Sequence, residues 1–268
     1  MKSQLYFIVL LVLILSNGTA NAQYVKLDNK QIIHLIKVDS LNNRIYKILS
    51  PKNQVLSKGQ LSEYPMSSFY VDRYLDKSND SIVIKFRKLK KSDNVLKKDI
   101  SFYLTYGVYA DSITSKINID CNNIDALLKE TYQLDKKNRT DGNNDQKIDA
   151  LNQRLLFNIF DTCDFLYTIK NKKESSHYAL IILLHSNTRF QKKYLHLIEK
   201  AVKKGYLTNK EVVYLYDKIL VDDKKLQKYG TQSYYNEQGN LELLPYDNIY
   251  KVNKRRVKVG LTSITLSN

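Results

Sequence analysis

The six residues Gln227-Lys228-Tyr229-Gly230-Thr231-Gln232 follow directly on a strong helical pattern in the last part of the 268-residue chain. They combine a glycine with two amides, a phenol and a hydroxyl. This composition disfavours a helix and supplies many hydrogen-bonding groups. We therefore predict a shaped loop here, and the stretch from Gln227 to Leu261 is the candidate ligand-facing segment of the chain.

Seven polar side chains are candidate site residues. His185 ends a short apolar helical segment, where the helix carbonyls favour a charged imidazole, so it is a candidate acid or base in catalysis. In and after the loop, amides and hydroxyls can bind a ligand hydroxyl or amide, and guanidinium groups can bind a carboxylate or phosphate. These ligand-binding candidates are Gln227, Tyr229, Thr231, Gln232, Arg255 and Arg256.

The same residues also have a structural interpretation. His185 would cap its helix by binding the last carbonyl groups. The loop side chains would satisfy the backbone of a long irregular segment, with an arginine paired to Asp247 or Asp217. Both alternatives stay open on the sequence.

The region before the loop has the apolar spacing of helices. Apolar residues recur at every third or fourth position in 124–132, 148–166 and 189–204, and Thr208-Asn209-Lys210-Glu211 forms a capping box before another such pattern. The segment His177 to His185 is so apolar that we predict a central helix buried on all sides. Residues 121–268 are therefore expected to form a helical domain that includes the extended Tyr-Gly-Thr-Gln segment.

Residues 23–120 have the alternation and turn signals of strands. Ser81 to Lys88 is the clearest strand, with Ile82, Ile84 and Phe86 on one face. The segments 31–38, 44–49 and 100–109 are also predicted strands. The expected fold class is α+β, with a β-rich N-terminal module built on an antiparallel sheet and a mostly α-helical C-terminal domain. We see no candidate chemistry in this module, which fits a packing or adhesion role.

The first 22 residues have the three parts of a secretory signal peptide. Lys2 supplies a positive start, Leu5 to Leu15 is apolar, and Ala20-Asn21-Ala22 has small residues at the cleavage-setting positions. The apolar run rises only about 16 Å as a helix, against roughly 30 Å of bilayer hydrocarbon. We expect an exported protein, periplasmic or extracellular, cleaved after Ala22 and without a transmembrane segment in the mature chain.

Cys121 and Cys163 are the only cysteines. They either form one disulfide in an oxidising compartment, or Cys163 is a buried thiol within an apolar helical pattern. Two cysteines among scattered histidines lack the closely spaced ligand pairs of a zinc site. The acidic stretch around Gly142 lacks carboxylates at the positions that a calcium loop requires. We expect neither a metal nor a cofactor.

The chain is basic, with a net charge of +16, but only eight of its 43 basic residues are arginine. Its abundance of lysine, asparagine, isoleucine and tyrosine is a bias that A/T-rich codons produce, and the lysines are spread along the chain. Nucleic acid is therefore not the expected partner, because its binders concentrate charge and favour arginine. The expected partner is an unknown polar ligand or an envelope component. Nonspecific attraction to an anionic polysaccharide, a lipid headgroup or extracellular DNA stays open.

From about Asp125 to Leu261 the chain resembles a family of uncharacterised bacterial domains. The family is marked by Asp-x-x-x-Arg, a helix ending in histidine, a helix with Asp-Arg, Gln-x-Tyr-Gly-Thr-Gln, and an arginine pair leading to Gly-Leu. The matching positions are Asp135 and Arg139, Asn152, His185, Gln191, Asp217, Gln227 to Gln232, Asp247, Arg255 with Arg256, and Gly260-Leu261. Lys218 replaces the arginine of the Asp-Arg pair, and Asp164-Phe165 lacks the glycine usual near there. The resemblance implies a helical domain with a shared polar site, and no particular activity.

The leading hypothesis is an exported two-part protein whose Gln227–Gln232 loop binds a polar ligand. The first alternative is a hydrolase acting on cell-envelope or extracellular polymers, with His185 as acid or base and Arg256 or Gln232 stabilising developing charge. The second is a structural or interaction protein with no pocket. The chain lacks the Gly-x-Ser-x-Gly elbow, the His-Glu-x-x-His pair and the Gly-rich phosphate loop of common hydrolases and nucleotide-binding proteins.

Overall fold

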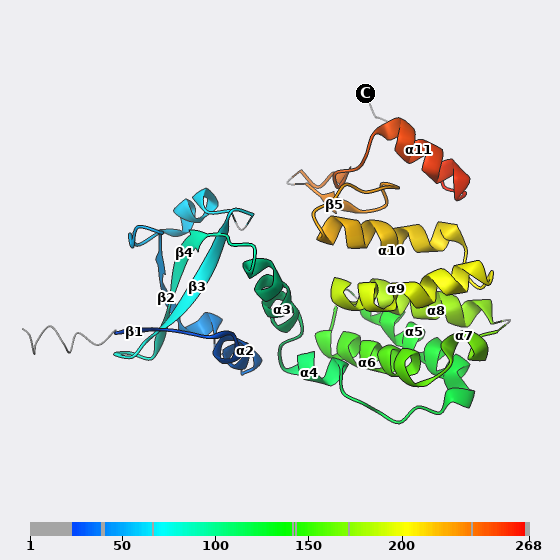
Figure 1. The fold of residues 1–268 in the computed structure, drawn as a ribbon, viewed down its shortest axis with the longest axis horizontal. Helices are drawn as coiled ribbons and strands as arrows, with labels where there is room; N and C mark the ends of the chain where they lie inside the picture. The colour runs from blue at the N-terminus through cyan, green and yellow to red at the C-terminus, as the bar shows by residue number, and fades with distance from the viewer. Residues whose placement is uncertain are drawn as a thin grey trace, which may run out of the picture. The chain divides into compact units, whose positions relative to one another are not determined.

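The structure, a computed structural model, describes residues 23–265 except 39, 40, 66, 141, 143, 171 and 237, and describes only the backbone of 42, 95, 96, 98 and 99. The chain divides into two compact units between Val108 and Tyr109, so residues 109–120 belong to the unit that contains the helices. Figure 1 shows a sheet in the first unit and helices in the second, which confirms the α+β fold class. The predicted signal peptide, residues 1–22, lies outside the described residues.

The first unit is built on a four-stranded sheet in the order β1-β3-β4-β2. Its strands are β1 (Tyr24–Lys26), β2 (Ile45–Leu49), β3 (Phe69–Asp76) and β4 (Ser81–Lys88). β3 pairs antiparallel with β1 and β4, but β2 runs parallel to β4. The sheet is therefore mixed rather than purely antiparallel, and the predicted strand Ser81–Lys88 is confirmed.

Two of the predicted strands in this unit are helices. All but the last residue of the segment 31–38 lies in α2 (Asn29–Lys37), which opens with a capping box between Asp28 and Gln31 and buries Ile32 and Ile36, four residues apart. The segment 100–109 mostly lies in α3 (Asp93–Tyr106). The strand predictions were wrong because short apolar runs also satisfy the helical period, and the pairing of α2 with α3 decides between them.

The core of the first unit lies on one face of the sheet. It joins Ile32 and Ile36 of α2, Ile100 of α3 and Ile82 of β4. Because strand side chains alternate between faces, Val83 and Lys85 of β4 lie on the opposite face. Short 3₁₀ turns, η1 (Asn42–Arg44), η2 (Lys58–Glu63) and η3 (Gly107–Tyr109), complete the unit up to the boundary with the second.

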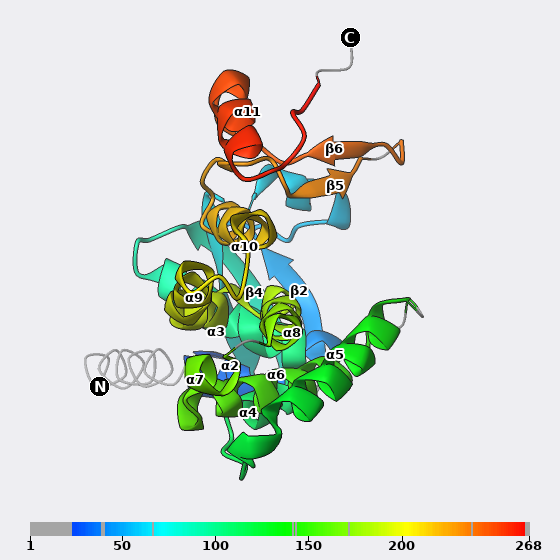
Figure 2. The same ribbon diagram turned by 90° about the vertical axis from the view of Figure 1, so that its right-hand side faces the viewer.

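The second unit contains helices followed by a small hairpin and a last helix. Its elements are α4 (Ala110–Ile113), η4 (Cys121–Asn123), α5 (Ile124–Thr140), α6 (Gln146–Thr162), α7 (Phe165–Thr168), α8 (Lys173–Leu184), α9 (Thr188–Lys203), α10 (Asn209–Asp222), β5 (Ser233–Tyr235), β6 (Leu241–Leu243) and α11 (Ile249–Lys258). The capping box predicted at Thr208 and Glu211 opens α10. The hairpin and α11 lie beyond α10, on its side away from α9 (Figures 1 and 2).

Helix α8 is central to this unit, because it contacts α5, α6, α9 and α10. Its Ala179, Leu180, Ile182 and Leu183 are buried. A stripe at the helical spacing of 177, 181, 184 and 185 is only half-buried. The prediction of burial on all sides was therefore wrong, and one face of the central helix remains open.

Cys121 and Cys163 form a disulfide with a Cα–Cα distance of 5.7 Å. The bond ties η4, which leads into α5, to the end of α6 across 42 residues of sequence. Closing a loop of this length stabilises the folded state by about 4 kcal/mol in the chain-entropy account. The disulfide, not the buried free thiol, is the alternative that the structure shows.

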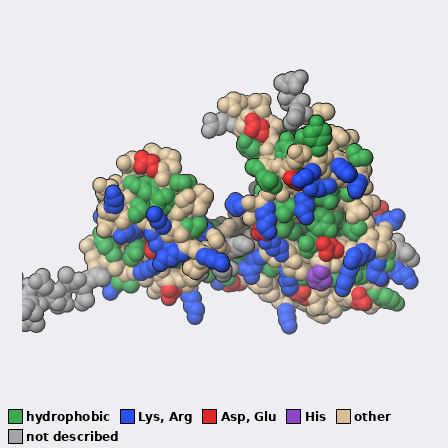
Figure 3. Space-filling model, turned by 45° about the horizontal axis from the view of Figure 1, so that its top comes forward, with side chains coloured by type: hydrophobic (Ala, Val, Ile, Leu, Met, Phe, Trp, Pro, Cys, Tyr) green, Lys and Arg blue, Asp and Glu red, His purple; other side chains and the backbone are tan. Residues whose placement is uncertain are grey.

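Lysine and arginine side chains are spread over both units on the face shown in Figure 3. On this face the basic side chains are dispersed and do not form one concentrated patch. Within the described part of the chain, the helices are too short or too polar to cross a bilayer.

Candidate functional site

The Gln227–Gln232 loop folds around the carboxylate of Asp217, a fully buried residue on α10. The Oδ1 atom accepts hydrogen bonds from the backbone N–H of Lys228 (2.8 Å) and Tyr229 (3.2 Å). The Oδ2 atom accepts from the N–H of Tyr229 and Thr231 and from the Thr231 hydroxyl, each at 3.1 Å. A buried carboxylate is costly unless donors surround it, so the loop and Asp217 require each other.

Gln227 holds the two ends of the loop together from a fully buried position. Its amide nitrogen donates to the carbonyl oxygens of Gln232 (2.9 Å) and Leu244 (2.7 Å). Its amide oxygen accepts from the backbone N–H of Gln232 at 2.7 Å. All of these contacts are internal to the protein.

Both arginines of the pair on α11 donate hydrogen bonds to backbone carbonyl groups of the same loop. Arg256 donates to the carbonyl oxygens of Tyr229 (2.6 Å) and Gly230 (3.2 Å), and to that of Thr262. Arg255 donates to Lys228 O at 3.2 Å and forms an ion pair with Asp247 at 2.7 Å. These contacts match the structural interpretation, in which the arginines satisfy backbone carbonyls and pair with an acid.

One loop residue, Gln232, reaches a cavity. The cavity has a volume of about 510 Å³ and lies between α8 and α10. Its apolar lining comes from Leu180, Ile181 and Leu184, with Tyr214 opposite. We call this cavity the α8–α10 cleft; it exists because the open stripe of α8 is not covered by another helix.

His185 also lines the α8–α10 cleft. Its Nδ1 atom lies 2.8 Å from Oδ2 of Asp135 on α5, a side chain only 3% exposed. Asp135 in turn lies 3.7 Å from Arg139, which is paired with Asp149 at 2.7 Å. A buried carboxylate on one ring nitrogen orients the imidazole and leaves the other nitrogen free for the cleft.

Lys218 of α10 adds a cation beside His185. Its ammonium group donates to Leu184 O at 2.6 Å, at the end of α8. Burial lowers the pKa of Lys218, and the nearby guanidinium of Arg139 lowers it further against the opposing effect of Asp222. Gln191 donates to the same carbonyl at 3.0 Å, so the end of α8 is held from two sides.

A second histidine lines the other end of the α8–α10 cleft. His177 Nδ1 lies 3.1 Å from Glu211 Oε1, and both residues are lining residues, together with Lys210. The eight-residue separation of the histidines corresponds to about 12 Å along the helix axis, too far for one metal ion to bind both. Within the described residues no group of His, Cys, Asp and Glu could hold a metal ion.

The structure therefore separates the candidate residues into two groups. His185 and Gln232 line one cavity. Gln227, Thr231, Arg255 and Arg256 have polar atoms engaged within the loop, and the N–H of Tyr229 is bound to Asp217. His185, Gln232 and Arg256 do not converge on one cleft.

Sequence reasoning did not assign a role to Asp135, Lys218 or His177. Asp135 was visible only as a position of the family resemblance. One helical face is indicated by the spacing of His177, Ile181, Leu184 and His185. The sequence of an apolar helix with histidines at its ends does not show which face stays open.

Comparison of the chain with protein-family models, with curated proteins and with solved structures found no match. The family resemblance accordingly stays a prediction.

Gly230 provides a test of how tightly the loop is packed. Its φ is +59°, and a Cβ there would lie 2.7 Å from Cδ1 of Ile264. Gly205 has a similar φ of +74° with open space around it. We expect Gly205→Ala to cost about 1–2 kcal/mol for the left-handed backbone alone, and Gly230→Ala to cost up to about 1 kcal/mol more, because the terminal methyl of Ile264 must shift to make room. Urea unfolding of both variants measures the difference, and equal losses would contradict the packing described.

Proposed function

We propose that the helical unit binds a small ligand in the α8–α10 cleft. The ligand would have an apolar body lying on Leu180, Ile181 and Leu184, and a polar or anionic group near His185, Lys218 and Gln232. The binding site would be this cleft, with Gln232 as the contribution of the Gln227–Gln232 loop. The rest of the loop would position Gln232 rather than contact the ligand.

One observation carries this proposal: three of the polar side chains that line one largely apolar cavity come from different elements. His185 ends α8, Lys218 lies on α10, and Gln232 follows the Asp217-bound loop. An apolar cavity with a few convergent polar groups is the common form of a small-molecule site, and about 510 Å³ lies within the usual size range.

A hydrolase is the second candidate, and the contact between His185 and Asp135 favours it. A histidine with a buried carboxylate on one nitrogen can take a proton from water with the other. Lys218, rather than Arg256, would stabilise developing negative charge, because Arg256 donates to the loop carbonyls. In this candidate the substrates would be cell-envelope or extracellular polymers whose end groups enter the cleft.

We also propose that the protein is exported and that Gln23 is its first mature residue. The Cys121–Cys163 disulfide supports this, because such bonds persist in oxidising compartments. Mass spectrometry of the protein recovered from its host should find an N-terminus at Gln23. An intact N-terminus at Met1 in the recovered protein would contradict export by cleavage.

Binding in the α8–α10 cleft can be tested by thermal shift against sugars, peptidoglycan fragments and nucleotides. A ligand at about a hundred times its Kd stabilises the folded state by about 2.7 kcal/mol, which raises Tm by about 5 °C or more in a unit of this size. We expect Gln232→Ala and Lys218→Met to remove most of that shift while leaving the unliganded protein folded.

Gln133→Ala is the matched control, because Gln133 is exposed on α5 away from the cleft residues. It should keep the full shift. A shift that survives in both cleft variants would place the ligand elsewhere, and no shift with any compound class would remove the support for binding. Turnover of a compound that is lost in both His185→Asn and Asp135→Asn would assign the hydrolase instead.

A further inference from the structure

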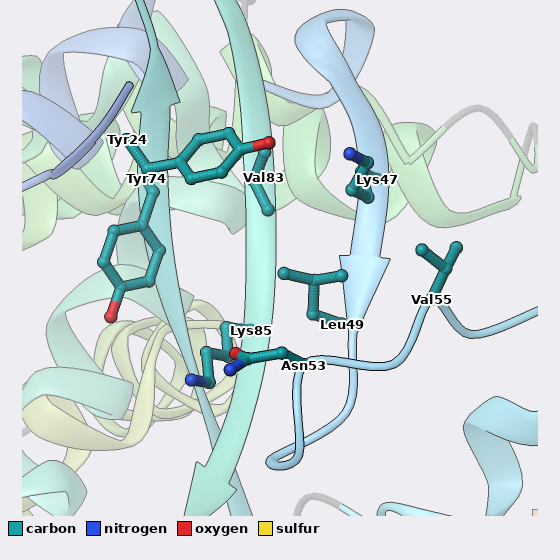
Figure 4. A pocket seen from close by; sticks show the side chains of 8 residues that line it. All are labelled: Tyr24, Lys47, Leu49, Asn53, Val55, Tyr74, Val83 and Lys85. Atoms are coloured by element: carbon teal, nitrogen blue, oxygen red, sulfur yellow. The ribbon is translucent and has the colours of Figure 1, made fainter. Parts of the chain in front are cut away.

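The sheet of the first unit has a second cavity that the proposed function does not use. It has a volume of about 470 Å³ and lies on the sheet face opposite the core of α2 and α3. Figure 4 shows its side chains across the four strands of the sheet, with Tyr24 and Tyr74 at one side and Lys47 and Leu49 at the other. We call it the sheet groove.

One half of the sheet groove is aromatic. Tyr24 of β1 and Tyr74 of β3 are half-buried, so each presents part of its ring to the groove. The neighbouring floor is Val83 of β4, which is 1% exposed. Flat rings beside an apolar floor form a surface on which the carbon face of a ring-shaped ligand can lie.

Two lysines line the sheet groove at different points along its strands (Figure 4). Lys47 of β2 and Lys85 of β4 are half-buried and line the groove. Among the described residues neither ammonium group has a carboxylate within ion-pair distance. Asp72 lies opposite Lys85 in the strand register, but its carboxylate is bound by Lys26 and Arg87, each at 3.0 Å. Half-buried cations without a counter-charge are complementary to an anion.

The outer wall of the groove is the chain that returns along β2. Val55 forms a bridge with Leu49, and Asn53 takes a left-handed backbone with φ +64° at the turn. Both side chains line the groove. Asn53 brings an amide that can both donate to and accept from ligand hydroxyls.

We propose that the sheet groove binds an acidic sugar unit, a saccharide ring that carries a carboxylate. The ring would lie on Tyr24 and Tyr74, its carboxylate would bind one of the two lysines, Lys47 or Lys85, and Asn53 would bind a ring hydroxyl. An exported protein would meet such units in anionic polysaccharides. This site lies within the first unit, so it is independent of the α8–α10 cleft.

A nucleic-acid strand fits the same face less well. The groove offers two lysines and no lining arginine, whereas strand binders use a continued cationic track with stacking side chains. A single carboxylate on a sugar ring requires only one nearby cation, and the groove offers two.

The test uses the full mature chain and isothermal titration with a short oligogalacturonate at low salt. We expect binding that is lost when the carboxylates are methyl-esterified, because the esters cannot neutralise the lysines. The double variant Lys47→Gln/Lys85→Gln should weaken binding at least about tenfold, the usual scale for loss of charge-assisted contacts. Tyr74→Ala should weaken it as well, through loss of the ring contact.

The control is Lys30→Gln/Lys91→Gln, which removes the same charge from exposed positions in the same unit, with Lys30 on α2 across the sheet from the groove. It should bind within about twofold of the wild type, because distant exposed charges contribute little. Equal weakening in both double variants would show nonspecific attraction and overturn the proposal. So would the absence of binding to oligogalacturonate, or tighter binding of a single-stranded oligodeoxynucleotide. None of these results depends on the α8–α10 cleft.

Discussion

The hydrogen bonds between the Asp217 carboxylate and the loop that follows α10 are the interaction on which the C-terminal part of the structure depends. Three backbone N–H groups and a hydroxyl converge on one fully buried acid. Without them the loop would leave donors unsatisfied, at about 1–3 kcal/mol for each one that is buried. The buried carboxylate would also be uncompensated, at a cost of several kcal/mol. Gln227 and Arg256 complete the arrangement by binding the groups that Asp217 does not reach. The first role of the Gln227–Gln232 motif is therefore structural, because its polar groups satisfy hydrogen bonds within the protein.

The same arrangement explains why one residue of the motif reaches the α8–α10 cleft. Once the loop is closed around Asp217, Gln232 leaves it beside Tyr214, whose carbonyl accepts its amide N–H at 3.3 Å. The cleft itself arises because α8 packs against four helices and still keeps one stripe open. His185 lies at the end of that stripe, held by an acid from a helix 50 residues earlier. Neighbouring residues therefore have separate roles: the residues bound to Asp217 hold the loop in place, and Gln232 lines the cleft.

Much of the architecture, but only part of the candidate site, could be predicted from the sequence. The α+β order, the capping box of α10 and the strand Ser81–Lys88 could all be predicted, because each has a periodic or capping signal. The helix α3 was missed because Phe102, Leu104 and Tyr106 alternate like a strand, although Leu104 is 48% exposed and only Phe102 and Tyr106, four apart, are buried. Asp135 could not be assigned to His185, since no local pattern reports which distant helix supplies a partner. The sheet groove was missed for the same reason, as its residues come from all four strands.

Amide hydrogen exchange in the loop tests the role of Asp217 most directly. In the wild-type protein the amides of Lys228, Tyr229 and Thr231 should exchange as slowly as those in the middle of α10, because a buried carboxylate accepts all three. In Asp217→Asn, where the side-chain charge is removed and one acceptor becomes a donor, their protection should fall while that of α8 is retained. Wild-type amides that exchange as fast as those of the exposed hairpin turn at Gly239 would contradict the account.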